Sequence, residues 1–133
     1  MLATPRPDFR RRAQNRLLPK LLSKTHRVAM GRRFAATFAL INESVGEDAF
    51  RRYESRTKLF KGPFLISAFE ALASGVWHNH DKWMKAKAPA RKLLGLVKKM
   101  WDTKEFSESK GIGKAAKSRI PKTVSFGKKF FVP

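Results

Sequence analysis

The stretch that decides the fold is Gly62-Pro-Phe-Leu-Ile-Ser-Ala-Phe-Glu-Ala-Leu-Ala-Ser-Gly-Val-Trp77. It predicts a helix beginning at Gly62-Pro63, because proline at a first helical position lacks only an N–H that would have no intrahelical partner. Apolar residues lie on more than one face of this helix, as is typical of a helix in the centre of a core. We expect it to end near His78 to Asp81.

A second helix is predicted before this stretch and a third after it. Apolar residues spaced three or four apart predict a helix over about Met30 to Val45, which Gly46 ends in a left-handed conformation. Its inward stripe comprises Phe34, Phe38, Ile41 and Val45. The third helix runs from near Pro89 to Trp101, with the inward residues Leu93, Leu94, Val97, Met100 and Trp101.

Strand signals are nearly absent from the remaining sequence. Glu47–Tyr53 is expected to form a short helical turn, and 51–61 a polar, basic connection. Only Thr123–Phe126 alternates in polarity, and it is too short to define a sheet. The fold class predicted is therefore all-α, a small helical bundle with basic N- and C-terminal arms.

Three parts are expected along the 133 residues. Residues 1–29 form a basic arm with a short helix over Phe9–Leu18, which Pro19 ends or kinks. Residues 30–108 form the helical bundle. Residues 109–133 form a basic segment that Pro121 interrupts and phenylalanines anchor on the bundle.

The charge of the chain narrows its class of partner. Thirty lysines and arginines against ten acidic residues give a net charge of +20, which favours polyanions such as nucleic acids. Without cysteine there is no disulfide and no thiolate zinc site. No apolar run is long enough to span a membrane, and no secretory signal is recognised. We expect a cytoplasmic protein, although the arginine-rich start is also compatible with a mitochondrial-type presequence.

The segment Trp77-His-Asn-His-Asp81 invites a comparison with nucleases and metal sites. Nucleases named for the letters His-Asn-His spread these residues over a ββα-metal unit, so adjacent letters are not that motif. Histidines two apart on a helix end point in different directions and need further ligands to hold a metal. We predict a polar helix terminus here, no metal and no cofactor.

Glu70 is the one charged residue between Gly62 and Trp77. We expect it to pair with Arg51, Arg52 or Arg56 rather than to act as an acid or base. No spacing among the acidic residues demands general acid–base chemistry, so no catalytic residue is predicted.

The closing stretch Gly111-Ile-Gly-Lys114 is reminiscent of a phosphate-binding loop, but it lacks the spacing and the preceding strand of a Walker loop. Nucleotide hydrolysis is therefore not expected. The glycines and the cations after them suit contacts with nucleic-acid phosphates instead. The alternative is a solvated tail, against which Phe126, Phe130 and Phe131 favour a docked segment with Lys114, Lys117 and Arg119 facing outward.

Three blocks carry a resemblance to a known family. They are Val45-Gly-Glu-Asp-Ala-Phe-Arg-Arg52, Phe64-Leu-Ile-Ser-Ala-Phe-Glu-Ala71 and Gly111-x-Gly-x-x-x-Lys-Ser-Arg-Ile-Pro121. Together they resemble the helical C-terminal region of the GmrSD-type family, ParB-like nucleases and NTPases of bacterial restriction and phage defence. The resemblance covers about Arg32 to Phe131. The family's catalytic Asp-Gly-Gln-Gln-Arg-type motif and the HNH domain of some members are missing, so it implies an accessory half without catalysis of its own.

The function expected is a non-catalytic basic module that binds nucleic-acid phosphates, with DNA favoured over RNA. Its binding residues are predicted to be Arg10, Arg11, Arg12, Arg32, Arg33, Lys114, Lys117, Arg119 and Lys122. Three alternatives stay open. They are an adaptor that docks on a separate nucleotide-hydrolysing or nuclease subunit, a basic component of a nucleoprotein particle, and an enzyme that uses His78, His80 and Asp81.

Overall fold

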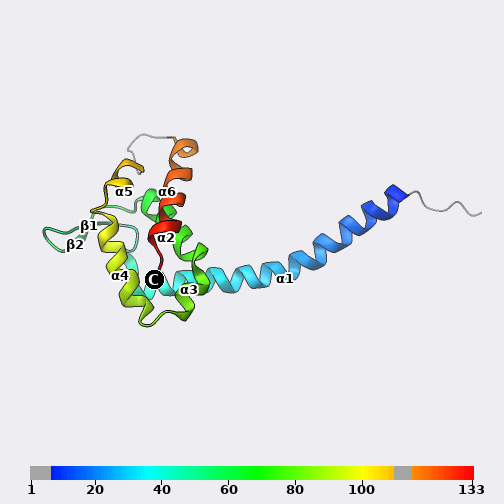
Figure 1. The fold of residues 1–133 in the computed structure, drawn as a ribbon, viewed down its shortest axis with the longest axis horizontal. Coiled ribbons are helices and arrows are strands. Elements are labelled where there is room, and N and C mark those ends of the chain that lie inside the picture. The colour runs from blue at the N-terminus through cyan, green and yellow to red at the C-terminus, as the bar shows by residue number, and fades with distance from the viewer. Residues whose placement is uncertain (1–6, 110–114) are drawn as a thin grey trace, which may run out of the picture. The chain divides into compact units, whose positions relative to one another are not determined.

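The computed structural model describes the backbone of residues 7–109 and 115–133, and the side chains of residues 24–108 and 115–133. The described chain is mostly helical, which confirms the all-α class (Figure 1). Its helices are α1 (Pro7–Ser44), α2 (Ile66–His78), α3 (His80–Lys85), α4 (Pro89–Met100), α5 (Lys104–Ser109) and α6 (Ala116–Phe130). A 3₁₀ turn at Gly46–Asp48 and the strands β1 (Arg52–Glu54) and β2 (Leu59–Lys61) lie between α1 and α2.

The chain divides into two compact units, residues 1–33 and residues 34–133. Helix α1 begins in the first and ends in the second. It continues through Pro19, so of the two predicted effects of this proline, an end or a kink, the helix end is not observed. Lys114 and the other residues of 110–114 lie outside the described residues.

In the second unit Gly46 has φ +69°, as predicted for the residue that stops α1.

The predicted stripe of α1 is confirmed for Ile41, which is buried, and for Phe38 and Val45, which pack against the core, but not for Phe34. Thr37, Leu40 and Ile41 are buried, whereas Phe34 is 57% exposed. All these residues fit a helical period, and only the neighbouring elements decide which face of a helix is covered. The prediction that Phe34 points into the core is wrong.

The connection over residues 51–61 is a β-hairpin rather than irregular chain. Strands β1 and β2 pair antiparallel, with Tyr53 opposite Phe60 and their ring centroids 4.9 Å apart. The Nζ atom of Lys98 lies 5.3 Å from the centroid of the Tyr53 ring, which is a cation–π contact with α4. Three-residue strands carry too little alternation to be recognised in sequence.

Helix α2 occupies the core as predicted, but it begins at Ile66 instead of Pro63. The preceding chain is held extended because the backbone N–H of Leu65 donates to the carbonyl of Phe50 (2.8 Å). Ala68, Ala71, Leu72 and Val76 of α2 are all fully buried.

Helix α6 packs directly on α2, and two glycines allow the close approach (Figure 1). A Cβ atom on Gly75 would collide with the Gly127 carbonyl oxygen, and one on Gly127 would collide with the Ala71 carbonyl oxygen. The prediction that Pro121 interrupts this segment is wrong, since α6 is continuous through it. The predicted anchoring is present, because Phe126 and Phe131 are buried.

Helix α4 has the bounds that its sequence predicts and turns Leu93, Val97 and Met100 into the core. Beyond it, the Phe106 ring of α5 lies between Trp101 (5.1 Å) and Phe126 (5.5 Å), measured between ring centroids. The second unit therefore has one continuous core, onto which both α4 and α6 pack.

Candidate nucleic-acid interface

The structure places the predicted phosphate-binding residues in different surroundings. The side chains of Arg10, Arg11 and Arg12 lie outside the described residues, as does Lys114. Arg32 is exposed on α1 and Arg33 is half-buried there. Both belong to the first unit of the chain.

On α6, Lys117 and Lys122 are exposed, as a phosphate-binding role requires. Arg119 is not, because its side chain is only 15% exposed and faces α2. The expectation that Arg119 points outward is wrong.

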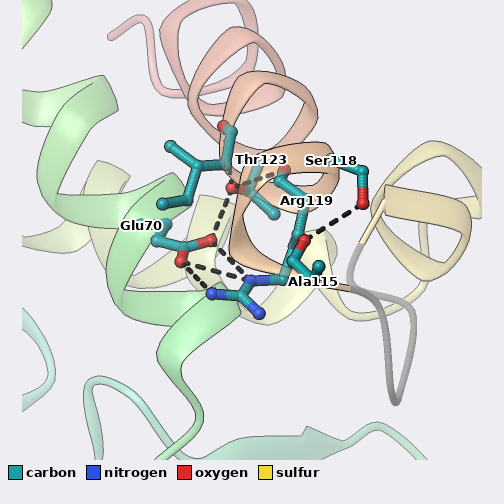
Figure 2. Close-up of polar contacts among 6 residues, drawn as sticks. Glu70, Ala115, Ser118, Arg119 and Thr123 are labelled. Carbon is teal, nitrogen blue, oxygen red and sulfur yellow. Dashed lines mark hydrogen bonds and ion pairs between the residues drawn. The ribbon is translucent and has the colours of Figure 1, made fainter.

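Arg119 forms a hydrogen-bonded ion pair with Glu70 of α2 (Figure 2). Its Nη2 atom donates to Oε1 of Glu70 (2.8 Å), and its Nε atom lies 3.2 Å from each carboxylate oxygen. The hydroxyl of Thr123, one helical turn further along α6, donates to Oε2 of Glu70 (2.7 Å). One carboxylate thereby holds two successive turns of α6.

The ionisation of this pair follows from its contacts. Burial raises the pKa of Glu70, but the hydrogen bonds from Arg119 and Thr123 and the charge of Arg119 outweigh it, so the pKa lies below its ordinary value. The hydrogen bond to Glu70 raises the pKa of Arg119. Both groups are charged at neutral pH, so Glu70 has no proton to donate as a general acid. The arrangement fastens α6 to α2.

The predicted partners of Glu70 are engaged elsewhere or exposed. Arg51 pairs with Asp48 (2.7 Å) and donates from Nε to the carbonyl of Gly62 (2.7 Å). Arg52 and Arg56 are exposed on the hairpin. The prediction of an Arg51, Arg52 or Arg56 partner is wrong, because the pairing residue lies 49 positions away on α6.

The His-Asn-His segment has its own structural role, carried by Asn79. The buried Nδ2 of Asn79 lies 3.1, 2.9 and 3.0 Å from the carbonyl oxygens of Gly75, Lys128 and Phe131 respectively. The Nε1 of buried Trp83 also donates to the Phe131 carbonyl, at 2.9 Å. The sequence analysis did not predict this role. The signal available in the sequence was a polar residue with tryptophans on both sides of it.

No cluster of histidine and acidic side chains suited to a metal ion is found within residues 24–108 and 115–133. His78 is exposed and His80 is half-buried at the junction of α2 and α3.

A positive surface of the second unit lies where the sequence prediction placed no binding residue. Between Lys82 and Trp101 the chain carries seven basic residues and no acidic one: Lys82, Lys85, Lys87, Arg91, Lys92, Lys98 and Lys99. All except Lys98 are exposed. The absence of acids over this run was the signal that could have revealed it.

Helix α4 presents the centre of this surface to solvent. Arg91, Lys92 and Lys99 line a shallow hollow of about 220 Å³ together with Val132 and Pro133. The C-terminal end of α6 brings two further exposed lysines, Lys128 and Lys129, to the side of α3 on which Trp83 binds Phe131. We call Arg91, Lys92, Lys99 and their hollow the α4 cationic surface.

Five acidic residues of the second unit are engaged in local contacts. Asp48, Glu54, Glu70 and Glu108 form ion pairs, and Asp102 accepts a hydrogen bond from Ser55 (2.6 Å). No acidic residue lies between Lys82 and Trp101, so α4 itself carries no negative charge that would offset the α4 cationic surface.

None of the described helices is long and apolar enough to cross a membrane. Comparisons with known proteins identify no relative: no family model, no curated protein and no solved structure matches this chain.

Proposed function

We propose that this protein is a non-catalytic helical module that binds the phosphates of nucleic acid through the α4 cationic surface. The observation that carries the proposal is the exposed run of basic residues from Lys82 to Lys99, uninterrupted by any acid. Lysine and arginine side chains release condensed counterions when they neutralise phosphates, and this release drives sequence-independent binding. The exposed lysines of α6, Lys117 and Lys122, are proposed as additional phosphate contacts.

The binding is expected to read little sequence. Helix α4 presents lysine and arginine without the asparagine or glutamine side chains that pair with adenine edges. Phosphate contacts position a protein on nucleic acid without specifying bases. DNA is the favoured partner.

The biological setting that we propose is an accessory part of a bacterial restriction or phage-defence nuclease system in the cytoplasm. Its support is the resemblance of three sequence blocks to the GmrSD-type family, together with the contacts between those blocks. Phe50 of the first block packs on Phe64 and Phe69 of the second. Glu70 of the second pairs with Arg119 of the third.

Binding is tested by fluorescence anisotropy with labelled duplex DNA. The purified protein is titrated at two salt concentrations, alongside the variant Arg91→Glu/Lys92→Glu/Lys99→Glu. The matched control, Arg52→Glu/Arg56→Glu/Lys58→Glu, makes the same change in net charge on the hairpin. We expect the α4 variant to lose at least about tenfold more affinity than the control, since phosphate contacts are local.

Equal losses in the two variants would show that net charge alone attracts DNA, and would contradict an interface on α4. An affinity that does not change with salt would contradict phosphate binding altogether. The defence setting has a separate test, co-purification of the chain from its native host with a nucleotide-hydrolysing or nuclease protein.

A further inference from the structure

Five phenylalanines form a continuous cluster at the surface of the second unit. They come from α1, the 3₁₀ turn region and the start of α2, and are Phe34, Phe38, Phe50, Phe64 and Phe69, hereafter the phenylalanine patch. Ring centroids of neighbours lie 4.7 Å apart for Phe34–Phe38 and 6.1 Å for Phe38–Phe69. Phe50 lies 5.2 Å from Phe69 and 5.3 Å from Phe64.

Much of this patch is open to solvent. Phe34 is 57% exposed, Phe64 56% and the nearby Ile66 52%, while the other three rings are half-buried. Single exposed apolar residues are ordinary, but a contiguous apolar surface marks a site of interaction. The patch does not contribute to the cationic surface on α4, so the proposed function leaves it unexplained.

The β-hairpin, which lies between Phe50 and Phe64 in the sequence, carries mainly positive charge. The β-hairpin carries Arg52, Arg56 and Lys58, all exposed and without an ion pair to any described residue. The hairpin acid Glu54 is occupied by Lys61 (3.3 Å). The contact from Arg51 to the Gly62 carbonyl ties the base of the hairpin to the segment that leads into Phe64 (2.7 Å).

We infer that the phenylalanine patch and the cationic hairpin are a docking site for a separate protein, which presents an apolar helical stripe flanked by carboxylates. Charge complementarity identifies this occupant, since the apolar rings would accept leucine-type anchors while the hairpin attracts acidic side chains. A second copy of the chain fits poorly, because a two-fold interface would bring two identical cationic hairpins together. Unpaired bases could stack on the exposed rings of Phe34 and Phe64, and the test below distinguishes them from a helical partner.

The test uses a fluorescein-labelled amphipathic peptide of about 18 residues, long enough for a helix of several turns. Leucines form its apolar face and glutamates its flanks, and a second peptide has lysines in place of the glutamates. Binding to the full chain is measured by anisotropy at physiological salt. We expect the glutamate peptide to bind and the lysine peptide to bind at least about tenfold more weakly.

Two variants locate the site. Phe34→Ser/Phe64→Ser changes only exposed rings, and circular dichroism checks that its helices remain. Arg52→Glu/Arg56→Glu/Lys58→Glu changes only the hairpin and supplies a second route if the first variant unfolds. Each is expected to weaken binding of the glutamate peptide by about tenfold or more, whereas reversal of the α4 cationic surface leaves it nearly unchanged.

Three results would overturn the inference. If the α4 variant weakens peptide binding as much as the hairpin variant does, the net positive charge of the chain attracts the peptide. If the wild type self-associates and Phe34→Ser/Phe64→Ser abolishes this self-association, the patch binds a second copy of the chain. If the same variant loses single-stranded DNA binding while its peptide binding is unchanged, the phenylalanine rings stack on nucleic-acid bases. The DNA experiment on α4 is separate, so either proposal can fail alone.

Discussion

The guanidinium of Arg119 on α6 is bonded to the carboxylate of Glu70 on α2, with Nη2 and Oε1 2.8 Å apart. This contact joins two residues 49 positions apart and closes the helix pair at the centre of the second unit. Arg119 therefore acts in folding, whereas its neighbours Lys117 and Lys122 face solvent.

The first prediction separates these roles. Arg119→Ala leaves Glu70 as a nearly buried carboxylate without its charged partner, and we expect the melting temperature to fall by several degrees. Lys117→Ala, the matched surface control, should change the melting temperature little and DNA affinity more. Circular dichroism melts and anisotropy titrations measure the two effects. An unchanged melting temperature for Arg119→Ala, with DNA binding reduced, would show that Arg119 is a phosphate ligand after all.

Acidification gives a second prediction from the same pair. Because the pKa of Glu70 is lower in the folded chain than in the unfolded chain, its contribution to stability is complete above its ordinary pKa, about 4.5. That contribution is lost as the pH falls through the depressed pKa. Melts of the wild type and Glu70→Gln between pH 7 and pH 3 should therefore show a stability difference that shrinks towards acid. A difference that is constant over this range would contradict the ionised pair.

The glycine contact between α2 and α6 supplies a third prediction. Gly127→Ala would push a methyl group against the Ala71 carbonyl, which belongs to helical backbone and cannot rotate away. We expect a loss of at least about 1–3 kcal/mol in the free energy of unfolding, the usual range for overpacking. The control is Gly95→Ala on the exposed face of α4, where a Cβ meets nothing within 4 Å. It should stabilise by about 0.5–1 kcal/mol because alanine is the better helix former. Equal effects in the two variants would rule out a close crossing of α2 and α6.

Asn79 is the subject of a fourth prediction. Asn79→Ala removes the amide that contacts three backbone carbonyls and leaves the Phe131 carbonyl with Trp83 as its remaining described donor. The Gly75 carbonyl keeps the backbone N–H of residue 79, so the Lys128 carbonyl is the acceptor that loses its described donor. Orphaning an acceptor costs about 1–3 kcal/mol, and denaturant unfolding should record a loss of that size. Met84→Ala, on the same helix as Trp83 but 48% exposed, serves as control and should change stability by less than about 0.5 kcal/mol. A loss in the control equal to that in Asn79→Ala would contradict a specific role for the amide.

The salt dependence of DNA binding provides a fifth prediction. The slope of log affinity against log salt is about −0.9 for each phosphate contacted. Removing Arg91, Lys92 and Lys99 together should flatten this slope by roughly 2–3. Anisotropy titrations at four salt concentrations measure the slope in each variant. An unchanged slope would place the phosphate contacts elsewhere on the chain.

Much of the secondary structure follows from local sequence. Pro89 and the periodic apolar residues after it predict α4 with its observed bounds, because a first-turn proline and a helical period are local properties. Gly46 likewise ends α1 with positive φ, a conformation in which glycine lacks the steric cost of other residues. The hairpin was missed because its pairing, rather than any preference of three residues, holds the strands together.

The sequence by itself determined the helical class, the positive charge and the position of α2 in the core. Only the tertiary structure decided that Glu70 pairs with Arg119, that Phe34 is exposed, and that α6 continues through Pro121. Each of these depends on contacts between residues distant in sequence, and a helical period does not specify which neighbour covers a face. Glu70 of α2 bonds to Arg119 before Pro121 and to Thr123 after it. The buried Phe126 and Phe131 hold the C-terminal end of α6 on the core. Tertiary packing thus maintains a helix that local preference alone would break.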